Sequence, residues 1–139
     1  MKQLLYVSHS HRELSENELL EILQQARTNN IANNISGILL YHKNYFIQLL
    51  EGEAEDIDEL YAKISKDARH QKINLIGRYD TPKRSFPEWS MGFKELSSQD
   101  IARVEGFNDI FIRQNGKSEL LQNPTILVEM LATLFEIKT

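Results

Sequence analysis

A glutamine stands in the middle of an apolar strand pattern, and its amide is a group that could do chemistry there. In "YFIQLLEG", residues 45–52, alternate positions face the same side of a strand, so Gln48 shares a face with Phe46 and Leu50. A carboxamide carries two N–H donors and an acceptor oxygen. Because a buried amide without partners costs about 1–3 kcal/mol, we expect hydrogen-bonding groups around Gln48.

Two further polar side chains fall where a core is expected. Asn30 ends the apolar stripe of a helix predicted over residues 14–30, and Tyr6 places a phenol in a predicted first strand. One interpretation is a structural network of a Tyr6–Gln48 hydrogen bond and an Asn30 helix cap. The other is a site for a planar ligand with polar edges between two helices, with Ile22 and Ile64 as aliphatic walls. The residues alone leave both interpretations open.

The elements that position these groups are predicted from periodicity and capping signals. Ser15 and Glu18 form a capping box at the start of the first helix. Residues 35–42 and 45–52 are two strand patterns separated by Lys43 and Asn44, which predicts a hairpin. The remaining predictions are strands over residues 2–9, 73–80 and 88–96, the last with Trp89, Met91 and Phe93 on one face, and a second helix over 54–70.

The resulting order, β-α-β-β-α-β-β, is typical of a ferredoxin-like α+β sandwich. In that topology the first and third strands are neighbours at the centre of the sheet. We therefore expect Tyr6 and Gln48 to lie opposite one another, both facing the layer of the two helices.

The opposite face of the sheet is apolar too, and it needs a cover. Its expected residues are Leu5, Val7, Ile38, Leu40, Ile47 and Leu49. Residues 97–104 predict a short helix capped by Ser97 or Ser98, and residues 123–137 predict a longer one with Asn123 as N-cap and Pro124 in its first turn. We expect a domain over residues 1–96 and a helical extension over 97–139 that packs on this second face and supports self-association or partner docking.

The composition and charge of the chain argue against several classes of protein. The chain has 139 residues, a formal net charge of −4 and no cysteine, which predicts a single-domain protein without disulfides or a thiolate nucleophile. The acidic balance argues against a nucleic-acid partner. No apolar run approaches the roughly 20 residues that span a membrane, so we expect a cytoplasmic protein with no membrane partner.

Six motifs resemble, in order and spacing, the BLUF domain, a blue-light sensor that uses flavin. They are "LLYVS", "ARTNN", "SGILLYH", "FIQLLEG", "DARH" and "FPEWSMGF", and the resemblance covers roughly residues 1 to 95. The remaining tail resembles that of short BLUF proteins, which carry two extra helices and no attached enzyme. One departure is Asn34, where many relatives have glycine; asparagine tolerates left-handed backbone geometry better than most residues.

The resemblance implies a flavin, FAD with FMN as an alternative, between the two helices. Tyr6 matches the family's tyrosine, Gln48 its hydrogen-bonding glutamine and Asn30 its ring-contacting asparagine. Trp89 and Met91 match the pair that exchanges places near the glutamine and relays the signal. With the aliphatic walls added, the residues expected around the cofactor are Tyr6, Ile22, Asn29, Asn30, Gln48, Lys63, Ile64, Asp67, Arg69 and His70.

The resemblance also implies a photocycle. Light moves an electron and a proton from Tyr6 to the flavin through Gln48, and the hydrogen bonds that remain afterwards carry the signal along the last strand to the tail and a protein partner. Gln48 either turns round or becomes its imidic tautomer. The sequence leaves open a small flavin-binding redox enzyme as the alternative function, and a homo-oligomer is expected.

Overall fold

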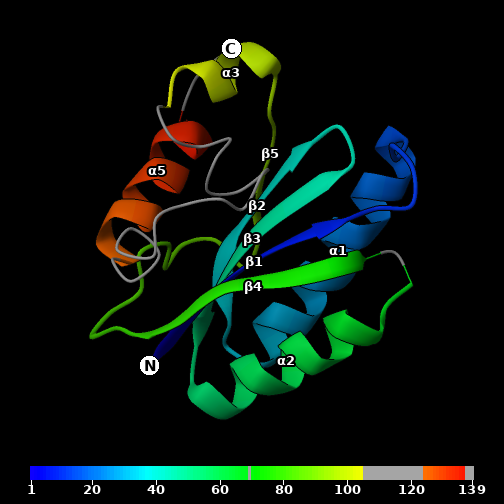
Figure 1. Cartoon of the computed structure of the whole chain (residues 1–139). Helices are drawn as coiled ribbons and strands as arrows, with labels where there is room; N and C mark the ends of the chain where they lie inside the picture. The colour runs from blue at the N-terminus through cyan, green and yellow to red at the C-terminus, as the bar shows by residue number, and fades with distance from the viewer. Residues whose placement is uncertain (69, 105–123, 137–139) are drawn as a thin grey trace.

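The computed structural model describes residues 1–68, 70–104 and 124–136. A five-stranded sheet is flanked by helices on both faces (Figure 1). Along the chain the elements are β1 (Lys2–His9), α1 (Glu16–Ala32), β2 (Ser36–His42), β3 (Tyr45–Gly52), α2 (Ala54–Lys66), β4 (Gln71–Asp80), β5 (Gly92–Glu95), α3 (Ser98–Ala102) and α5 (Pro124–Glu136).

The order of strands in the sheet is β4-β1-β3-β2-β5. β1 is antiparallel to both β3 and β4, and β5 is added parallel to β2 at the edge. This arrangement confirms the expected ferredoxin-like core with a fifth strand. Tyr6 lies directly opposite Gln48 in the β1–β3 register, as the sequence predicts.

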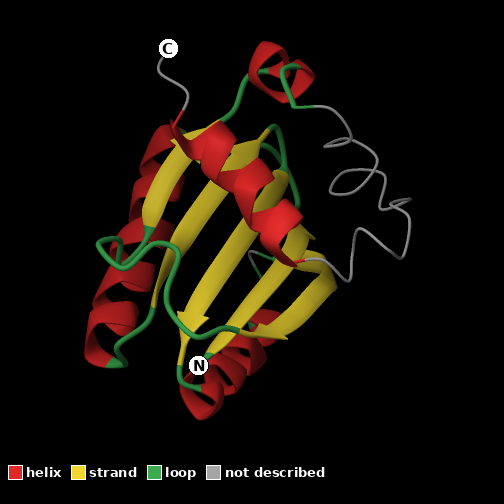
Figure 2. Cartoon of the chain, turned by 90° about the vertical axis from the view of Figure 1, so that its left-hand side faces the viewer, coloured by secondary structure: helices red, strands yellow, loops and turns green. Residues whose placement is uncertain are grey.

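Each face of the sheet carries its own apolar core. α1 and α2 lie on one face, and α5 crosses the strands on the other (Figures 1 and 2). The α1/α2 face buries residues such as Leu4, Tyr6, Leu39 and Phe46. On the α5 face the six predicted strand residues pack against Leu127, Leu131 and Leu134 of α5, so the tail covers this face as expected.

Local sequence signals explain where elements begin and turn. The Ser15 side chain accepts a hydrogen bond from the backbone N–H of Glu18, and the Glu18 carboxylate accepts one from the N–H of Ser15, which completes the capping box. Ser97 caps α3 in the same way with Asp100. Asn34 has φ 54°, so it adopts the left-handed conformation that glycine takes most easily.

The structure corrects the prediction for residues 88–96. β5 begins only at Gly92, and Trp89 and Met91 lie in the preceding loop rather than on one strand face. Met91 is buried in the α1/α2 core, whereas Trp89 as a residue is 48% exposed, and its ring contacts Phe135 of α5, with ring centroids 5.3 Å apart. The alternation rule fails here because it requires continuous strand pairing, and the first hydrogen-bonded pair of β5 is at Gly92.

The second helix is also shorter than predicted. α2 ends at Lys66, and Asp67 is its C-cap in an extended conformation with φ −78° and ψ 123°. Ala68 and His70, which the prediction includes in the helix, therefore follow it. The chain needs these residues to turn into β4, which starts at Gln71.

Candidate functional site

A cavity of about 240 Å³ lies between α1 and α2 and is also lined by residues of the sheet. Its walls come from helix residues on the two apolar stripes, and its floor comes from β2 and β3. Several of these helix residues, Ala26, Leu60 and Ile64 among them, remain partly exposed although they pack beside the core. The lining residues are Ile22, Gln25, Ala26, Asn29, Asn30, Leu39, Gln48, Leu60, Lys63, Ile64, Asp67 and His70.

Gln48 is the polar group on the floor of this cavity. Its side chain is 5% exposed, and its Oε1 accepts a hydrogen bond from the hydroxyl of Tyr6. Its Nε2 then faces the sulfur of Met91 at 3.5 Å, a weak acceptor. The amide is therefore bound firmly at its oxygen and only weakly at its nitrogen.

Tyr6 lies behind Gln48 and not on the cavity wall. Its side chain is buried, and burial, followed by the nearby Tyr61 and Asp67, raises the pKa of Tyr6 well above its ordinary value of 10.0. The phenol therefore keeps its proton and donates it in a hydrogen bond to Gln48. The Tyr61 ring packs beside the Tyr6 ring, with the two ring centroids 5.6 Å apart.

Asn30 joins the cavity to the loop before β5. It is fully buried, and its Nδ2 donates to the backbone oxygen of Ser90 at 2.5 Å. Within the described residues, its Oδ1 has no hydrogen-bond partner. Leaving a buried acceptor unpaired costs about 1–3 kcal/mol, so this oxygen is available to a donor from a bound molecule or a water.

Three of the charged or titratable residues predicted near the cofactor, Lys63, Asp67 and His70, line the cavity. His70 Nδ1 lies 2.7 Å from the Ser8 hydroxyl. The His70 ring also packs on Phe46, with centroids 4.8 Å apart. His70 thus faces the core as well as the cavity. Arg69 lies outside the described residues.

The cavity wall contains most of the residues that the sequence places around the cofactor, together with others whose role depends on tertiary contacts. Of the residues expected around the cofactor, those that line the cavity are Ile22, Asn29, Asn30, Gln48, Lys63, Ile64, Asp67 and His70. The prediction lacks four residues of the wall: Gln25, Ala26, Leu39 and Leu60. Leu39 is recoverable because it lies opposite Gln48 in the β2–β3 register, whereas no local signal marks Gln25.

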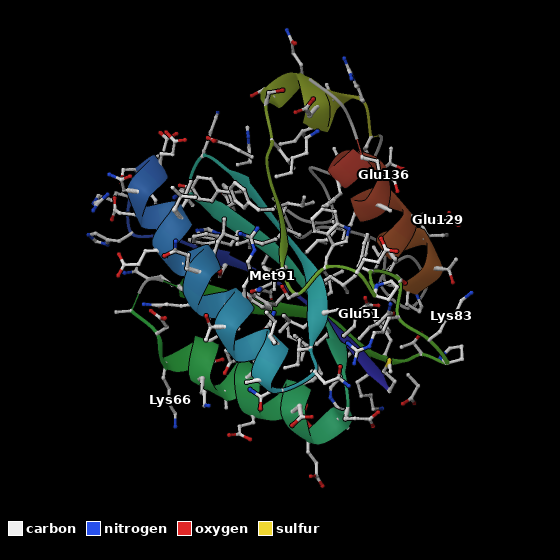
Figure 3. All side chains as sticks on the ribbon, turned by 180° about the vertical axis from the view of Figure 1, so that it is seen from behind. Glu51, Lys66, Lys83, Met91, Glu129 and Glu136 are labelled. Carbon is white, nitrogen blue, oxygen red and sulfur yellow. The ribbon has the colours of Figure 1, made fainter. Side chains whose placement is uncertain are left out.

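A second missed feature is the network that holds the loop between β4 and β5. The buried carboxylate of Glu51 accepts hydrogen bonds from the backbone N–H groups of Ser85 and Phe86, at 2.5 and 2.7 Å. The Arg84 guanidinium donates to the Ser36 hydroxyl and to the backbone oxygen of Glu51. This network holds the loop that leads to Met91 in place. Glu51 and Met91 are both labelled in Figure 3.

The site fits a flavin. An isoalloxazine ring is flat and apolar on both faces, which suits the aliphatic walls, and its rim carries carbonyl and N–H groups. The unpartnered Oδ1 of Asn30 suits the ring N–H, and the weakly held Nε2 of Gln48 suits a ring acceptor. The described residues contain no group of three or more His, Cys, Asp or Glu side chains that could hold a metal ion.

Comparison with known proteins decides the family. The model for sensors of blue-light using FAD, BLUF, matches residues 1–92. This chain belongs to the BLUF family. No helix in the described part of the chain is long and apolar enough to cross a membrane.

The BLUF relatives include enzymes and regulators. The photoactivated adenylate cyclase subunit beta of Euglena gracilis is 32% identical over 100 residues, 70% of this chain but only 12% of that protein. The blue light- and temperature-regulated antirepressor BluF of Escherichia coli (strain K12) is 33% identical over 84% of this chain and 28% of its own length. The chain therefore spans a minor part of these relatives.

A solved structure matches the chain over nearly its whole length. The photo-activated state of BlsA is 30% identical, with a TM-score of 0.73, and the match covers 99% of this chain and 96% of BlsA. The match extends past residue 92, where the match to the family model ends.

Proposed function

We propose that this BLUF protein senses blue light through a flavin held between α1 and α2, and that Tyr6 and Gln48 are its photoactive pair. The observation that carries the proposal is a continuous chain of contacts. The Tyr6 hydroxyl donates to Gln48, and the Gln48 amide, which lines the cavity, reaches the Met91 sulfur. A change made at the cavity floor therefore has a direct path to the loop before β5.

The flavin, when bound, supplies a strong one-electron oxidant after it absorbs blue light. Tyr6 is suited to give up the electron because its phenol is close to the cavity and protonated, so it has a proton to release together with the electron. The Gln48 oxygen, which accepts the Tyr6 hydrogen bond, is the first acceptor of that proton. Return of the proton and electron to Tyr6 leaves no product, so this is a signalling cycle.

The change that persists after the electron and proton have returned is a rearrangement of the Gln48 amide. Its amide has donors at one end and an acceptor at the other, so either a rotation or a shift to the imidic tautomer changes which group faces the cavity. The apolar surroundings of Phe46 and Leu50 give the amide few competing partners. Either rearrangement also changes what Gln48 presents to Met91.

The proposed output is the tail. Met91 directly precedes β5, and the loop residue Trp89 contacts Phe135 of α5. We propose that residues 1–96 bind the flavin, that residues 97–139 pass the signal on to a protein partner, and that the chain works as a homo-oligomer in the cytoplasm, without a nucleic-acid or membrane partner. Relatives named for an antirepressor and a cyclase support signalling to proteins.

FAD is the proposed cofactor, and a sensor is favoured over a redox enzyme. The family model names FAD. Acid extraction of purified protein followed by chromatography separates FAD from FMN. A redox enzyme would show multiple turnovers with NAD(P)H, whereas a sensor should consume no substrate in light or in dark.

The test of the photoactive pair is Tyr6→Phe with Tyr45→Phe as the matched control. Tyr45 packs beside the α5 face, away from the cavity, so its hydroxyl should be dispensable. Tyr6→Phe should still bind flavin but lose the light-induced red shift of the flavin absorption band, and Tyr45→Phe should keep it. A normal red shift in Tyr6→Phe would contradict the electron-donor role.

A further inference from the structure

The segment Trp89–Met91 is held at each of its carbonyl groups by a donor from elsewhere in the fold. The Trp89 oxygen accepts from the backbone N–H of Gly37 at 2.9 Å, the Ser90 oxygen from Asn30 Nδ2 at 2.5 Å, and the Met91 oxygen from Arg27 Nε at 3.0 Å. Two of these three donors are side chains of α1. The loop before β5 is therefore fastened to the first helix.

These three hydrogen bonds matter because the segment they hold contacts Gln48 and leads directly into Gly92, which packs against α5. The Met91 side chain is 1% exposed, and its sulfur lies 3.5 Å from the Gln48 amide nitrogen. On the other side of the sheet, Gly92 approaches Phe135 of α5 so closely that a Cβ there would lie 2.6 Å from the ring. A small movement of the Met91 backbone therefore changes both the contact of Met91 with Gln48 and the packing of the Phe135 ring against Gly92.

Arg27 is the donor best placed to control this movement. Unlike Asn30, it does not line the cavity, so its contact with Met91 can be removed without removing a wall of the flavin site. Unlike the backbone of Gly37, it is a long, partly exposed side chain that can release its acceptor and be hydrated. The planar guanidinium aims its N–H groups in fixed directions, which a flexible ammonium does not.

We infer that Arg27 is a positioning residue that holds the Met91 backbone in the dark state and so sets the lifetime of the lit state. This inference rests on the proposed function of the Gln48–Met91 contact. When the lit state moves the Met91 segment, the Arg27 hydrogen bond is lost, and its re-formation favours the return to the dark state.

The experiment compares Arg27→Ala with Arg103→Ala in the purified flavin-bound protein. Arg103 is exposed at the end of α3, so its loss removes the same charge without touching the segment. Thermal return of the red-shifted band should slow in Arg27→Ala by about two- to tenfold, the range expected for one hydrogen bond. Arg103→Ala should return at the rate of the parent protein.

A second readout needs no light. Trp89 is the single tryptophan of the chain, so its emission in the dark reports on this segment directly. Acrylamide should quench Trp89 faster in Arg27→Ala than in the parent, and Arg27→Lys should restore part of both effects because the ammonium is also a donor. A merely structural role would lower the unfolding temperature without changing the return rate.

Three results would overturn the inference: unchanged return and quenching in Arg27→Ala, equal changes in Arg103→Ala, or an Arg27→Lys variant that behaves as Arg27→Ala does. Failure of the proposed function is distinguishable, because the parent protein would then show no light-induced shift at all. The quenching of Trp89 in the dark would still report whether Arg27 holds the segment.

Discussion

Replacing Glu51 with glutamine should loosen the loop that carries Met91 and cost much of the stability of the fold. Glu51 is fully buried, and both of its carboxylate oxygens accept hydrogen bonds. One oxygen serves the N–H of Ser85 and the side chain of Gln3, and the other serves the N–H of Phe86. Glu51→Gln keeps the size of the side chain and exchanges one acceptor for an NH2 group.

The magnitude follows from those contacts. One of the two backbone N–H groups loses its acceptor and faces an amide NH2 instead. Loss of a hydrogen bond to a charged group, with a buried donor left unpaired, lowers the free energy of unfolding by about 2–4 kcal/mol. For a chain of this size, that corresponds to a fall of roughly 8–16 °C in the unfolding temperature.

The assay is thermal and urea unfolding followed by circular dichroism, with Glu53→Gln as the matched control. Glu53 is exposed and makes no capping hydrogen bond with its side chain, so its replacement should change the unfolding temperature little. The emission of Trp89 should also shift in Glu51→Gln because the loop is released. If Glu51→Gln unfolds at the same temperature as Glu53→Gln, the network does not anchor the loop and the reasoning is refuted.

Three further outcomes are expected. Asn30→Ala should weaken flavin binding by about tenfold, measured by equilibrium dialysis, because it removes the buried acceptor that we propose for the ring N–H; unchanged affinity would contradict that role of Asn30. Gly92→Ala should destabilise the protein by about 1–3 kcal/mol because the new methyl meets the Phe135 ring, and adding Phe135→Leu should recover part of that loss in a double-mutant cycle. Hydrogen bonds with Arg12 first and then with Ser15 lower the pKa of Glu18 to about 2, so the stability from these contacts is present above the ordinary pKa of 4.5 and is lost as the pH falls toward 2. Arg12→Ala should remove the Arg12 share and raise the Glu18 pKa in an NMR titration.

The contact between Tyr6 and Gln48 was predictable because two simple rules determine it. Strand alternation gives the face of each residue, and the ferredoxin-like order makes β1 and β3 neighbours. The register then places Tyr6 opposite Gln48. The 3.6-residue period likewise puts Ile22, Asn30 and Ile64 on the helix faces that line the cavity, whereas their part in binding a flavin stays a prediction.

The course of the loop between β4 and β5 was not predictable. Alternation put Trp89 and Met91 on one face, but the structure sends Met91 into the α1/α2 core and Trp89 toward α5. The anchors that impose this course, Glu51 and Arg27, act through contacts with residues far away in the sequence. No local periodicity or spacing reports such contacts.

The end of α2 shows a similar limit. Its apolar stripe continues in the sequence to Ala68, yet the helix stops at Lys66. The competing requirement is tertiary, because the chain must reach the start of β4 at Gln71, antiparallel to β1. Local propensity gives way where a strand partner fixes the position of the next element.

The most direct test of the central claim is the absorption spectrum of the purified, flavin-bound protein before and after blue light, followed through recovery in the dark. If Tyr6 and Gln48 rearrange their hydrogen bonds at the edge of the ring, the flavin band shifts to longer wavelength and returns thermally, with the flavin still oxidised. A flavin band that bleaches, or that does not move under light while the protein remains folded, would contradict the account.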